Sequence, residues 1–346
     1  MSTPLSVTTR LTASHNQGKW KRILVGSLVV IFLTVAGILL SLALGAVEIP
    51  LDQTLRVIFG GGNETDRTII IESRLPRAIA ALLAGCNLAV AGTLLQAVTR
   101  NPLADPGLIG VTAGAALAAT IVLTVLPSSA AILPMAAFVG AMIAAVAVYT
   151  VSWRPGSGSS PMRMILAGVA INAILGAVIG VLITAFADRI PAIMFWTAGS
   201  FNGRGWGHVD ILWPYTLAGV VMAIWIRARL AAMELGDDSA ATVGVPVEGT
   251  RLIAFAAAAL LAGSAASVAG LVGFVGLVVP HVIRLLLGGN TGLIPVAAVA
   301  GGALLLWSDL AARMVLAPSE MPVGVVTGLI GGPYFIYLLY RSRWLQ

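Results

Sequence analysis

Long apolar runs separated by short polar loops make up most of the chain after residue 22. Several runs reach the roughly twenty residues that an α-helix needs to cross a bilayer. They predict about ten transmembrane helices, at residues 23–47, 75–98, 107–126, 131–152, 163–187, 208–228, 250–269, 272–287, 293–316 and 322–340. The eighth is short and contains Pro280, so we expect it to be tilted, broken or paired with part of the seventh.

The N-terminal segment has features of a secretory signal, because Lys19, Lys21 and Arg22 precede the first apolar run. That run is longer than the ~7 to 15 apolar residues of a signal sequence, so we predict a retained first helix. Residues 1–22 are then a cytoplasmic tail, and residues 23–346 form a single transmembrane domain. The predicted fold class is an all-α, polytopic membrane bundle.

Composition places the chain among integral membrane proteins. Of its 346 residues, 58% are hydrophobic and 10% are charged, against about a quarter charged in soluble domains, and the mean hydropathy is +0.98. The net charge of +6 does not indicate nucleic-acid binding, because the basic residues stand singly at the ends of apolar runs. Cys86 is the only cysteine in the sequence, which excludes an intrachain disulfide and a thiolate metal site.

Glycines inside the apolar spans predict close packing of helices. Gly110 and Gly114, and likewise Gly176 and Gly180, stand four residues apart, the spacing at which small residues let two membrane helices approach. They indicate a compact bundle and carry no information about cargo.

The basic residues predict the orientation of the chain. If the N-terminus is cytoplasmic, thirteen of the twenty lysines and arginines face the cytoplasm, as the positive-inside rule requires. These are Arg10, Lys19, Lys21, Arg22, Arg100, Arg154, Arg163, Arg227, Arg229, Arg251, Arg284, Arg341 and Arg343. Both termini are then cytoplasmic, whereas Arg74 and Arg77 lie together at an outer corner for which topology offers no reason.

Enzyme motifs are absent from the sequence. Its only lysines, Lys19 and Lys21, precede the first helix, so there is no GxxxxGK[ST] phosphate loop and we expect no ATP hydrolysis by this chain. The histidines His15, His208 and His281 are far apart and have no partners at metal-ligand spacing, and His281 is expected to pack at a helix end. We expect neither a metal nor a catalytic residue.

The polar segment of residues 227–251 separates the sixth and seventh predicted helices. Gly236, Asp237 and Asp238 open an alanine-rich stretch that Gly244 and Pro246 close, which predicts one or two short helices. From the pattern alone, two interpretations stay open. The segment is either a cytoplasmic helical knob that docks a partner or an ordinary connecting loop.

A series of motifs spans nearly the whole chain after residue 70. They are RLPR at residues 74–77 followed by LLAG, LLQ and RNPLADPGLIG, ILAGVAINA at 165–173, WTAGSF at 196–201, LGDDSAATVGV at 235–245, GFVGLVVPHVIRLL at 273–286, SDLAAR at 308–313 and MPVGVVTGLIGGPYFIYLL at 321–339. In this order they resemble the permease subunits of type II ATP-binding-cassette importers, the FecCD/BtuC-like family that takes up iron siderophores, haem and vitamin B12. Several independent motifs at the right spacing make the resemblance specific.

The resemblance implies a BtuC-like bundle of about ten helices in the bacterial cytoplasmic membrane. It implies a dimer with a second permease subunit, identical or paralogous, two ATPase subunits at the cytoplasmic side, and an extracellular or periplasmic substrate-binding protein. The ATPase subunits would hydrolyse ATP with Mg, while this chain would bind no cofactor and no nucleic acid.

The resemblance also assigns roles to residues near the two membrane surfaces. Arg74, Arg77 and Arg313 match arginines that face carboxylates of the binding protein, which suits the bidentate pairing of a guanidinium with a carboxylate. An internal pair of Arg313 with Asp309 is compatible with that role. Cytoplasmic coupling helices are implied at about residues 230–249, and the residues expected to contact the ATPase are Leu235, Gly236, Asp237, Asp238, Val243 and Gly244.

Two loops match the inner gates of the family. The corner of Asn101, Pro102 and Leu103 matches an inner gate loop, where a rigid proline turn would narrow the exit. The second inner gate of the B12 permease is a Thr-Ser pair at the start of the fifth helix. Pro161 and Met162 stand there in this chain, which puts a polar gate of the same chemistry in doubt.

For the pathway, the resemblance points to the fifth and tenth helices and to the short outer segment after the fifth. Asn172, Thr184 and Thr327 are polar residues inside apolar spans, and both a place on the pathway and plain interhelical hydrogen bonding are open for each. Trp196 and Phe201, near the outer mouth, either contact a bulky ligand or lie at the membrane interface.

The function that follows is translocation of ferric siderophore through a dimer-interface pathway by alternating access. Haem or vitamin B12 is the alternative cargo for the same architecture. An ion-coupled secondary transporter is the alternative from another class. Against it, the sequence has no convincing buried acidic relay, and such a transporter needs neither the outer arginines nor the inner knob.

Overall fold

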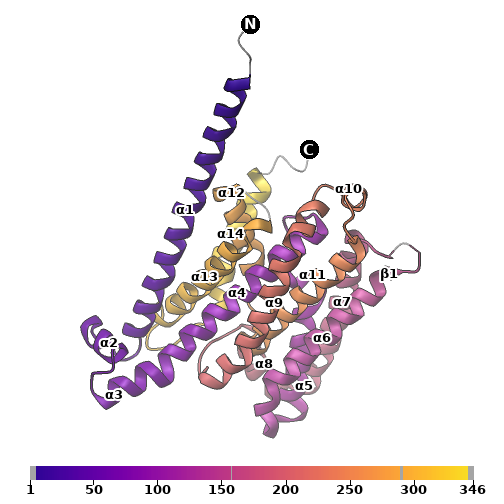
Figure 1. The fold of residues 1–346 in the computed structure, drawn as a ribbon. Coiled ribbons are helices and arrows are strands. Elements are labelled where there is room, and N and C mark those ends of the chain that lie inside the picture. The colour runs from indigo at the N-terminus through magenta and orange to yellow at the C-terminus, as the bar shows by residue number, and fades with distance from the viewer. Residues whose placement is uncertain (1–4, 157, 289–290, 342–346) are drawn as a thin grey trace.

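The computed structural model describes residues 5–156, 158–288 and 291–341, and it is almost entirely helical (Figure 1). Within these residues, seven helices are long and apolar enough to cross a membrane, and three shorter apolar helices accompany them. The predicted count of about ten is therefore confirmed. The ten are α1 (Leu5–Ala43), α4 (Leu75–Thr99), α5 (Val111–Val125), α6 (Leu133–Ser152), α7 (Pro161–Ala185), α9 (Trp206–Met233), α11 (Val247–Ala269), α12 (Val275–Leu287), α13 (Ile294–Met314) and α14 (Val323–Arg341).

Short elements fill the loops. They are α2 (Leu51–Ile58), α3 (Glu64–Arg67), the π-helix η1 (Thr68–Arg74), the 3-10 helices η2 (Pro106–Ile109), η3 (Pro127–Ile132), η4 (Ala187–Arg189) and η5 (Thr291–Leu293), α8 (Ile190–Thr197), α10 (Asp237–Thr242), and an antiparallel hairpin of β1 (Trp153–Arg154) with β2 (Gly158–Ser159). Helix α1 already begins at Leu5, so most of the predicted tail is continuous with the first crossing. Residues 1–4 and Arg343 of the orientation argument lie outside the described residues.

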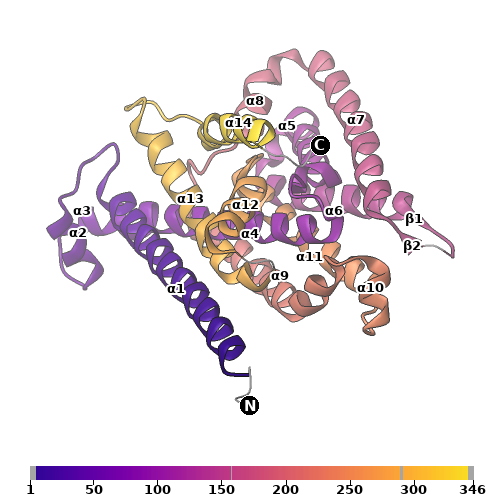
Figure 2. The same ribbon diagram turned by 90° about the horizontal axis from the view of Figure 1, so that it is seen from above.

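Helix α4 runs through the middle of the bundle and packs against α9, α11, α12 and α13 (Figure 2). Glycines bring the backbones together there. A Cβ on Gly85 would lie 2.2 Å from the carbonyl oxygen of Gly301, and one on Gly92 would lie 1.9 Å from that of Gly276. Because lipid tails supply little hydrophobic drive for helix pairing, such close van der Waals contact is what holds membrane helices together.

The irregularity expected around Pro280 lies before α12 rather than within it. Helix α12 continues through Pro280, whereas the break between α11 and α12 contains two residues with positive φ, Gly270 (71°) and Phe274 (67°). A Cβ on Gly270 would also meet the carbonyl oxygen of Trp196 at 2.3 Å. The seventh and eighth crossings are therefore two helices joined by a sharp corner that requires glycine.

Helix α7 lies at the edge of the bundle (Figure 2), and only Met164, Ala167 and Gly168 are buried along it. A Cβ on Gly176 or Gly180 would meet no atom within 4 Å, so these two glycines do not pack against this chain, contrary to the prediction. Gly114 does pack, since its Cβ would lie 2.3 Å from the carbonyl oxygen of Gly140.

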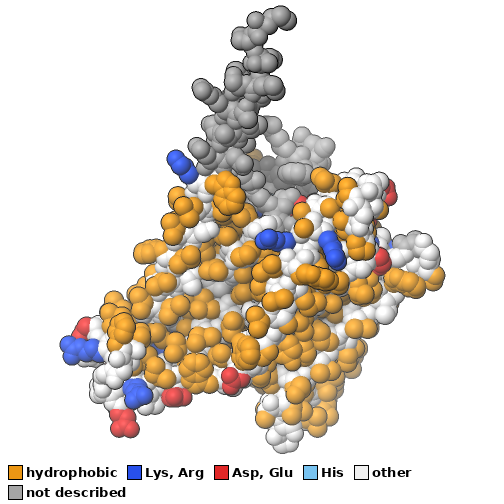
Figure 3. All heavy atoms as spheres, viewed as in Figure 1, with side chains coloured by type: hydrophobic (Ala, Val, Ile, Leu, Met, Phe, Trp, Pro, Cys, Tyr) orange, Lys and Arg blue, Asp and Glu red, His pale blue; other side chains and the backbone are white. Residues whose placement is uncertain are grey.

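Charged side chains gather toward the two ends of the face in Figure 3, and an apolar band lies between them. One end carries α10 and the hairpin and is also where the first residues of α1 lie, and the opposite end carries α2 and α3 (Figure 1). We call these the α10 end and the α2 end. Each end holds a group of arginines and carboxylates.

Candidate functional site

Arg74 at the α2 end is buried and bonded to backbone. Its Nη1 donates to the carbonyl oxygens of Leu42 (2.6 Å) and Ala43 (2.8 Å), and its Nη2 donates to that of Val47. The last carbonyl groups of a helix lack intrahelical partners and carry the negative end of the helix dipole. Arg74 therefore caps the C-terminus of α1, which is the structural reason for a basic residue at this corner.

Arg77, one turn further along α4, binds two carboxylates. Its Nη2 lies 2.8 Å from Oδ1 of Asp309 on α13, and its Nη1 lies 3.0 Å from both carboxylate oxygens of Glu320. Asp309 is 1% exposed and Glu320 is 31% exposed, so the arginine bridges a buried and a surface carboxylate. This bidentate geometry is the strong form of the guanidinium–carboxylate contact.

Arg313 lies one turn after Asp309 on α13 and points into the chain. Its Nε is 3.4 Å from Oδ2 of Asp309, and its Nη2 donates to Oγ of Ser41 on α1 at 2.6 Å. The internal pair with Asp309 that we considered from the sequence is thus present. Together, Arg74, Arg77, Asp309, Arg313 and Glu320 form what we call the α2-end cluster.

The arginines of the α2-end cluster are less exposed than their predicted docking role suggests. Arg74 and Arg313 are 6% and 8% exposed, and their guanidinium groups already bind groups of this chain. Burial of a guanidinium is tolerable only when its charge and donors find such partners. The Arg77 side chain is also only 11% exposed and is bound to two carboxylates of this chain, so docking by each of the three arginines stays a prediction.

Helix α10 forms the predicted short helix in the 227–251 segment. It begins after Gly236, whose φ of 118° suits glycine, and has Asp237 and Asp238 in its first turn, where acidic residues favour the helix dipole. Leu235 and Val243 flank it and are 80% and 71% exposed, and Gly244 follows with a φ of 82°. Two large apolar side chains exposed at an end of the bundle suit contact with a partner protein.

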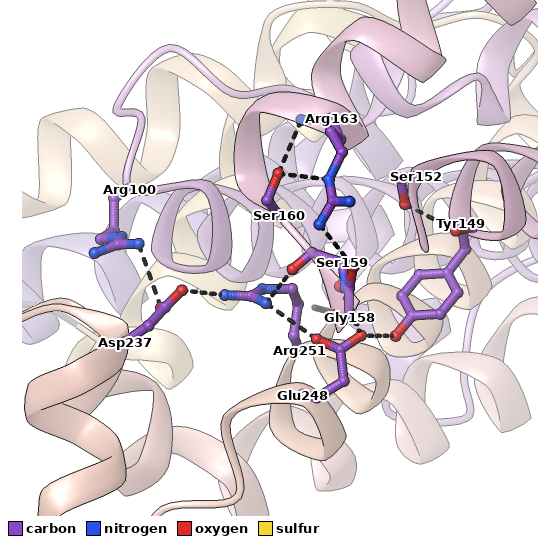
Figure 4. A network of polar contacts seen from close by, with 10 residues as sticks. All are labelled: Arg100, Tyr149, Ser152, Gly158, Ser159, Ser160, Arg163, Asp237, Glu248 and Arg251. Carbon is purple, nitrogen blue, oxygen red and sulfur yellow. Dashed lines mark hydrogen bonds and ion pairs between the residues drawn. The ribbon is translucent and has the colours of Figure 1, made fainter. Parts of the chain in front are cut away.

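Asp237 lies between two arginines in a polar network at the α10 end (Figure 4). Its Oδ1 lies 3.3 Å from Nη2 of Arg100, the left-handed residue that ends α4, and its Oδ2 lies 2.7 Å from Nη2 of Arg251 on α11. Arg251 is nearly fully buried, whereas Asp237 and Arg100 are more than one-third exposed. The two oxygens of one carboxylate thus connect segments that are far apart in the sequence.

The network continues from Arg251 into the β1–β2 hairpin. Arg251 Nη1 donates to the carbonyl oxygen of Ser159 at 2.6 Å and to Glu248 Oε2 at 3.1 Å. Glu248 Oε1 in turn accepts from the backbone N–H (3.1 Å) and hydroxyl (2.8 Å) of Ser159 and from the hydroxyl of Tyr149 (2.8 Å). We call Arg100, Asp237, Glu248, Arg251 and Ser159 the α10-end network.

The predicted gate loop begins directly after Arg100. The side chain of Asn101 accepts a hydrogen bond from the N–H of Leu103 at 2.9 Å, which holds the turn, and Pro102 is exposed. Further along, Asp105 caps η2 by accepting from the N–H of Gly107 at 2.8 Å. Burial raises the pKa of Asp105, and the bond from Gly107 offsets part of this rise.

The second predicted gate is at the start of α7. Ser160 caps the helix by accepting from the N–H of Arg163 at 3.3 Å, and Pro161 occupies the first helical turn, which proline favours. Met162 is 66% exposed. Arg163 Nη2 donates back to the carbonyl oxygen of Gly158 at 2.7 Å, so the hairpin and the start of α7 are tied to each other.

The predicted pathway residues are scattered. Asn172 donates to the carbonyl oxygen of Gly107 at 2.9 Å and so links α7 to η2, while Thr184 is exposed and bonds within α7. Thr327, Trp196 and Phe201 are 3%, 7% and 0% exposed. In this structure the last three side chains are packed inside the chain, which does not fit a lining position for a bulky ligand.

The histidines make local contacts. His208 Nδ1 accepts from the N–H of Gly205 at 3.3 Å, and the ring of His281 meets Tyr334 edge-on at 6.3 Å between centroids. The side chain of His15 lies outside the described residues. Among the residues that the structure does describe, no three His, Cys, Asp or Glu side chains are grouped so that they could hold a metal ion.

Sequence reasoning missed three residues that organise the two ends. Glu320 and Glu248 are the carboxylates that complete the two ionic groups described above. Gln96 is buried at the end of α4, where its Nε2 donates to carbonyl oxygens of Ala104 (3.3 Å) and Gly276 (3.2 Å) and its Oε1 accepts from Arg284. A polar residue in the LLQ motif of an apolar span was the available signal for Gln96, because such residues seldom face lipid.

Comparisons with known proteins agree with this architecture. Residues 30–341 match the model of the FecCD transport family. The chain is 38% identical over 329 residues to the iron(3+)-hydroxamate import system permease protein FhuG of Bacillus subtilis (strain 168), covering 91% of this chain and 96% of that protein. It is 38% identical over 315 residues to the hemin transport system permease protein HmuU of Yersinia pestis, covering 88% and 94%.

A solved structure shares the fold. It is an inward-facing metal-chelate type ABC transporter, which superposes with a TM-score of 0.81 at 26% identity and covers 91% of this chain and 99% of that one. The match of the family model and the identity to curated permeases both extend over nearly the whole chain, and they confirm the resemblance and the importer-permease interpretation drawn from the motifs. The chain is a multi-pass membrane protein that belongs to the FecCD transport family.

Proposed function

We propose that the chain is the membrane-spanning permease subunit of an ATP-binding-cassette importer for chelated iron, with ferric siderophore as cargo. A binding protein delivers the cargo at the α2 end, and two separate ATPase subunits hydrolyse ATP with Mg at the α10 end. The chain itself binds no cofactor. It lies in the bacterial cytoplasmic membrane with both termini and α10 in the cytoplasm, as its basic residues favour.

The observation that carries the proposal is α10. A six-residue helix with exposed Leu235 and Val243 beside it has no role inside the bundle that would need those side chains. Asp237 holds its first turn to Arg100 and Arg251, so force applied to α10 reaches the bundle. An exposed apolar knob that is mechanically linked to the transmembrane helices is what a coupling surface for an ATPase requires.

Helix α7 supports a dimer with a second permease subunit. Its exposed face carries Gly176 and Gly180, whose missing Cβ atoms leave space that this chain does not fill. Small residues four positions apart let a second helix approach closely in a membrane. We place the pathway along this face of the dimer, where Thr184 is exposed and Asn172 is half-buried.

At the α2 end, we propose that Arg77 alone meets a carboxylate of the binding protein. Arg74 and Arg313 then support it by fixing α1 and α13 around it. In this arrangement Glu320 occupies the outward side of the Arg77 guanidinium. On docking, a carboxylate of the binding protein therefore replaces Glu320 as a partner of Arg77. Because one ion pair is exchanged for another, the contact adds little affinity and mainly orients the binding protein and speeds its encounter with the permease.

Iron chelates are favoured as cargo because several similar permeases are named for iron(3+) or siderophore transport. Permeases named for hemin and for cobalamin are as identical to this chain, at 38%, as the one named for iron(3+)-hydroxamate. Ferric siderophore is therefore the main candidate, and haem or vitamin B12 is the alternative. Uptake into proteoliposomes that contain the permease and its ATPase, with binding protein outside and ATP inside, tests both. We expect ATP-dependent entry of ferric hydroxamate, and stronger entry of haem would change the cargo.

The same assay separates the importer from the secondary transporter. Permease alone is reconstituted with an imposed proton or sodium gradient and without ATPase or ATP. The importer proposal expects no uptake above that of empty liposomes. Gradient-driven uptake by this chain alone would contradict it.

A further inference from the structure

The contacts of α10 converge on the two loops to which the family resemblance assigns the inner gates. Arg100 is the residue before Asn101, and it ends α4 in a left-handed conformation. Its guanidinium is held by Asp237 Oδ1 at 3.3 Å. A displacement of Asp237 therefore acts on the residue that directly precedes the 101–103 loop.

The other oxygen of Asp237 leads to the second loop. Arg251 binds Asp237 Oδ2 at 2.7 Å and the carbonyl oxygen of Ser159 at 2.6 Å with different nitrogens of one guanidinium. Ser159 precedes Pro161 by two residues, and Glu248 holds its N–H and hydroxyl. The planar guanidinium of Arg251 thus links α10 to the residues before α7 through two hydrogen bonds, so that a shift of α10 also shifts those residues.

The two arms differ in burial. The Arg251 arm is buried at the arginine, whose side chain is 3% exposed and donates to the carbonyl oxygen of Ser159 in the hairpin. The Arg100 arm is longer, and both of its partners are more than one-third exposed, so water and salt weaken it. Gly158 shows how closely the hairpin fits, because a Cβ there would lie 2.7 Å from Glu248 Oε2.

We infer that Asp237 is a positioning residue that transmits movement of α10 to both inner loops, through a firm arm by way of Arg251 to residues 158–163 and a releasable arm by way of Arg100 to residues 101–103. The inference rests on the proposed importer function and adds to it the specific link between coupling helix and gates. The carboxylate of Asp237 then links the movements of two loops that are separated in the sequence by the whole of α5 and α6.

Substitution of Asp237 by asparagine tests the link, and an aspartate outside the coupling surface supplies the control. Asp237→Asn keeps the shape of the side chain but removes the charge that holds both arginines. Asp52→Asn makes the same chemical change at an exposed side chain on α2, at the opposite end of the bundle. Both variants are reconstituted with ATPase and binding protein, and cargo uptake and ATP hydrolysis are measured in the same liposomes.

We expect Asp237→Asn to lower cargo imported per ATP hydrolysed by roughly fivefold or more, with ATP hydrolysis continuing. Asp52→Asn should keep the wild-type ratio, Arg100→Gln should lower it less than Asp237→Asn, and Asp237→Glu should recover part of it. A wild-type ratio in Asp237→Asn overturns the inference. An equal fall in both asparagine variants also overturns it, because the effect would then not depend on the contacts of α10.

Amide hydrogen exchange provides a readout that does not depend on transport. In Asp237→Asn, exchange should rise at residues 101–104 and 158–163, and in Asp52→Asn it should stay at the wild-type rate. Unchanged exchange in Asp237→Asn contradicts the link even if uptake falls. Conversely, if the wild-type complex shows no ATP-driven uptake, the proposed function fails while the exchange result still decides whether the link exists.

Discussion

The α2-end cluster and the α10-end network use the same chemistry in different surroundings. At the α2 end, Asp309 is 1% exposed, and it binds Arg77 and Arg313 between two long helices, α4 and α13. At the α10 end, Asp237 is 36% exposed, and it joins α10 to Arg100, which ends α4, and to Arg251 on α11, which in turn binds the hairpin (Figure 4). The first arrangement fixes helices that pack along their length, whereas the second connects a short helix and a hairpin to the ends of two long helices.

The difference in burial determines how much each group of ion pairs contributes to stability. Removing one partner from a buried ion pair leaves an unpaired charge in a poorly solvated site, which costs about 3–5 kcal/mol, while exposed pairs contribute about 0–1 kcal/mol. Burial therefore suits the ion pairs that hold α4 to α13, because breaking them is costly. If α10 couples to gates as we propose, its contacts change during each transport cycle, and the partial exposure of Asp237 and Arg100 permits this.

The largest expected effect is on stability at the α2 end. Asp309→Ala leaves Arg77 and Arg313 facing each other without their shared carboxylate and should lower the free energy of unfolding by about 3–5 kcal/mol. Thermal unfolding of the purified subunit in detergent measures this loss. The control Asp188→Ala removes an aspartate that is 72% exposed and pairs with Arg189, and it should change stability little. Equal losses in both variants would remove the distinction between the two surroundings.

A single methyl group added at Gly158 should destabilise the hairpin at the α10 end. Gly158→Ala places a Cβ against Glu248 and forces alanine to a φ of 63°, so we expect a loss of about 1–3 kcal/mol together with weaker coupling of ATP hydrolysis to uptake. Gly156→Ala is the matched control, because its φ is 81° but its Cβ would meet no atom within 4 Å. Similar coupling in the two variants would mean that backbone strain, rather than displacement of Glu248, produces the effect.

Glu320 provides a test of docking at the α2 end. Glu320→Gln removes the internal competitor for Arg77, and it should strengthen capture of the binding protein by up to about fivefold, the equivalent of one exposed ion pair. Surface plasmon resonance with the permease in nanodiscs measures the change. Arg77→Gln should weaken capture, and unchanged affinity in both variants would place docking elsewhere on this end.

The smallest expected effect is the loss of stability when the exposed ion pair of Arg100 with Asp237 is removed. Arg100→Gln removes a pair in which both side chains are more than one-third exposed, and it should change the free energy of unfolding by less than about 1 kcal/mol. Thermal unfolding again measures it, with Arg189→Gln at another exposed pair as the reference. A loss as large as that of Asp309→Ala would show that the two ends do not differ as described.

Much of the fold could be predicted from the sequence, because apolar runs of membrane-spanning length are a local signal. The same holds for α10, whose glycine, acidic first turn and second glycine all lie within residues 236–244. The expectation that Gly176 and Gly180 pack within this chain was wrong, since spacing alone does not say which partner fills the space.

The polar contacts at the two ends could not be predicted, because their partners are distant along the chain. Arg74 bonds to Leu42, 32 residues away, and Arg77 pairs with Asp309 across 232 residues. Ser159 and Glu248 are 89 residues apart. Motif resemblance therefore marked Arg74 and Arg313 as surface arginines, while their burial follows from how α1 and α13 come together.

A distance measurement tests most directly whether the two ends differ in mobility during the transport cycle. Spin labels are placed at Met162 and Ser319 in one variant and at Glu72 and Ser319 in another, all exposed positions, after Cys86 is replaced by alanine. The labelled subunit is diluted with unlabelled subunit and assembled with ATPase and binding protein. Pulsed electron paramagnetic resonance then compares the nucleotide-free state with a state trapped by ATP and vanadate.

We predict that the distance from Met162 to Ser319 shifts between the two states, and that this shift is lost in Asp237→Asn. The distance from Glu72 to Ser319, which reports on the α2-end cluster, should stay the same in every sample. An unchanged Met162–Ser319 distance, or an equal shift at both pairs of labels, would contradict the account of a fixed α2 end and an α10 end that moves with the ATPase.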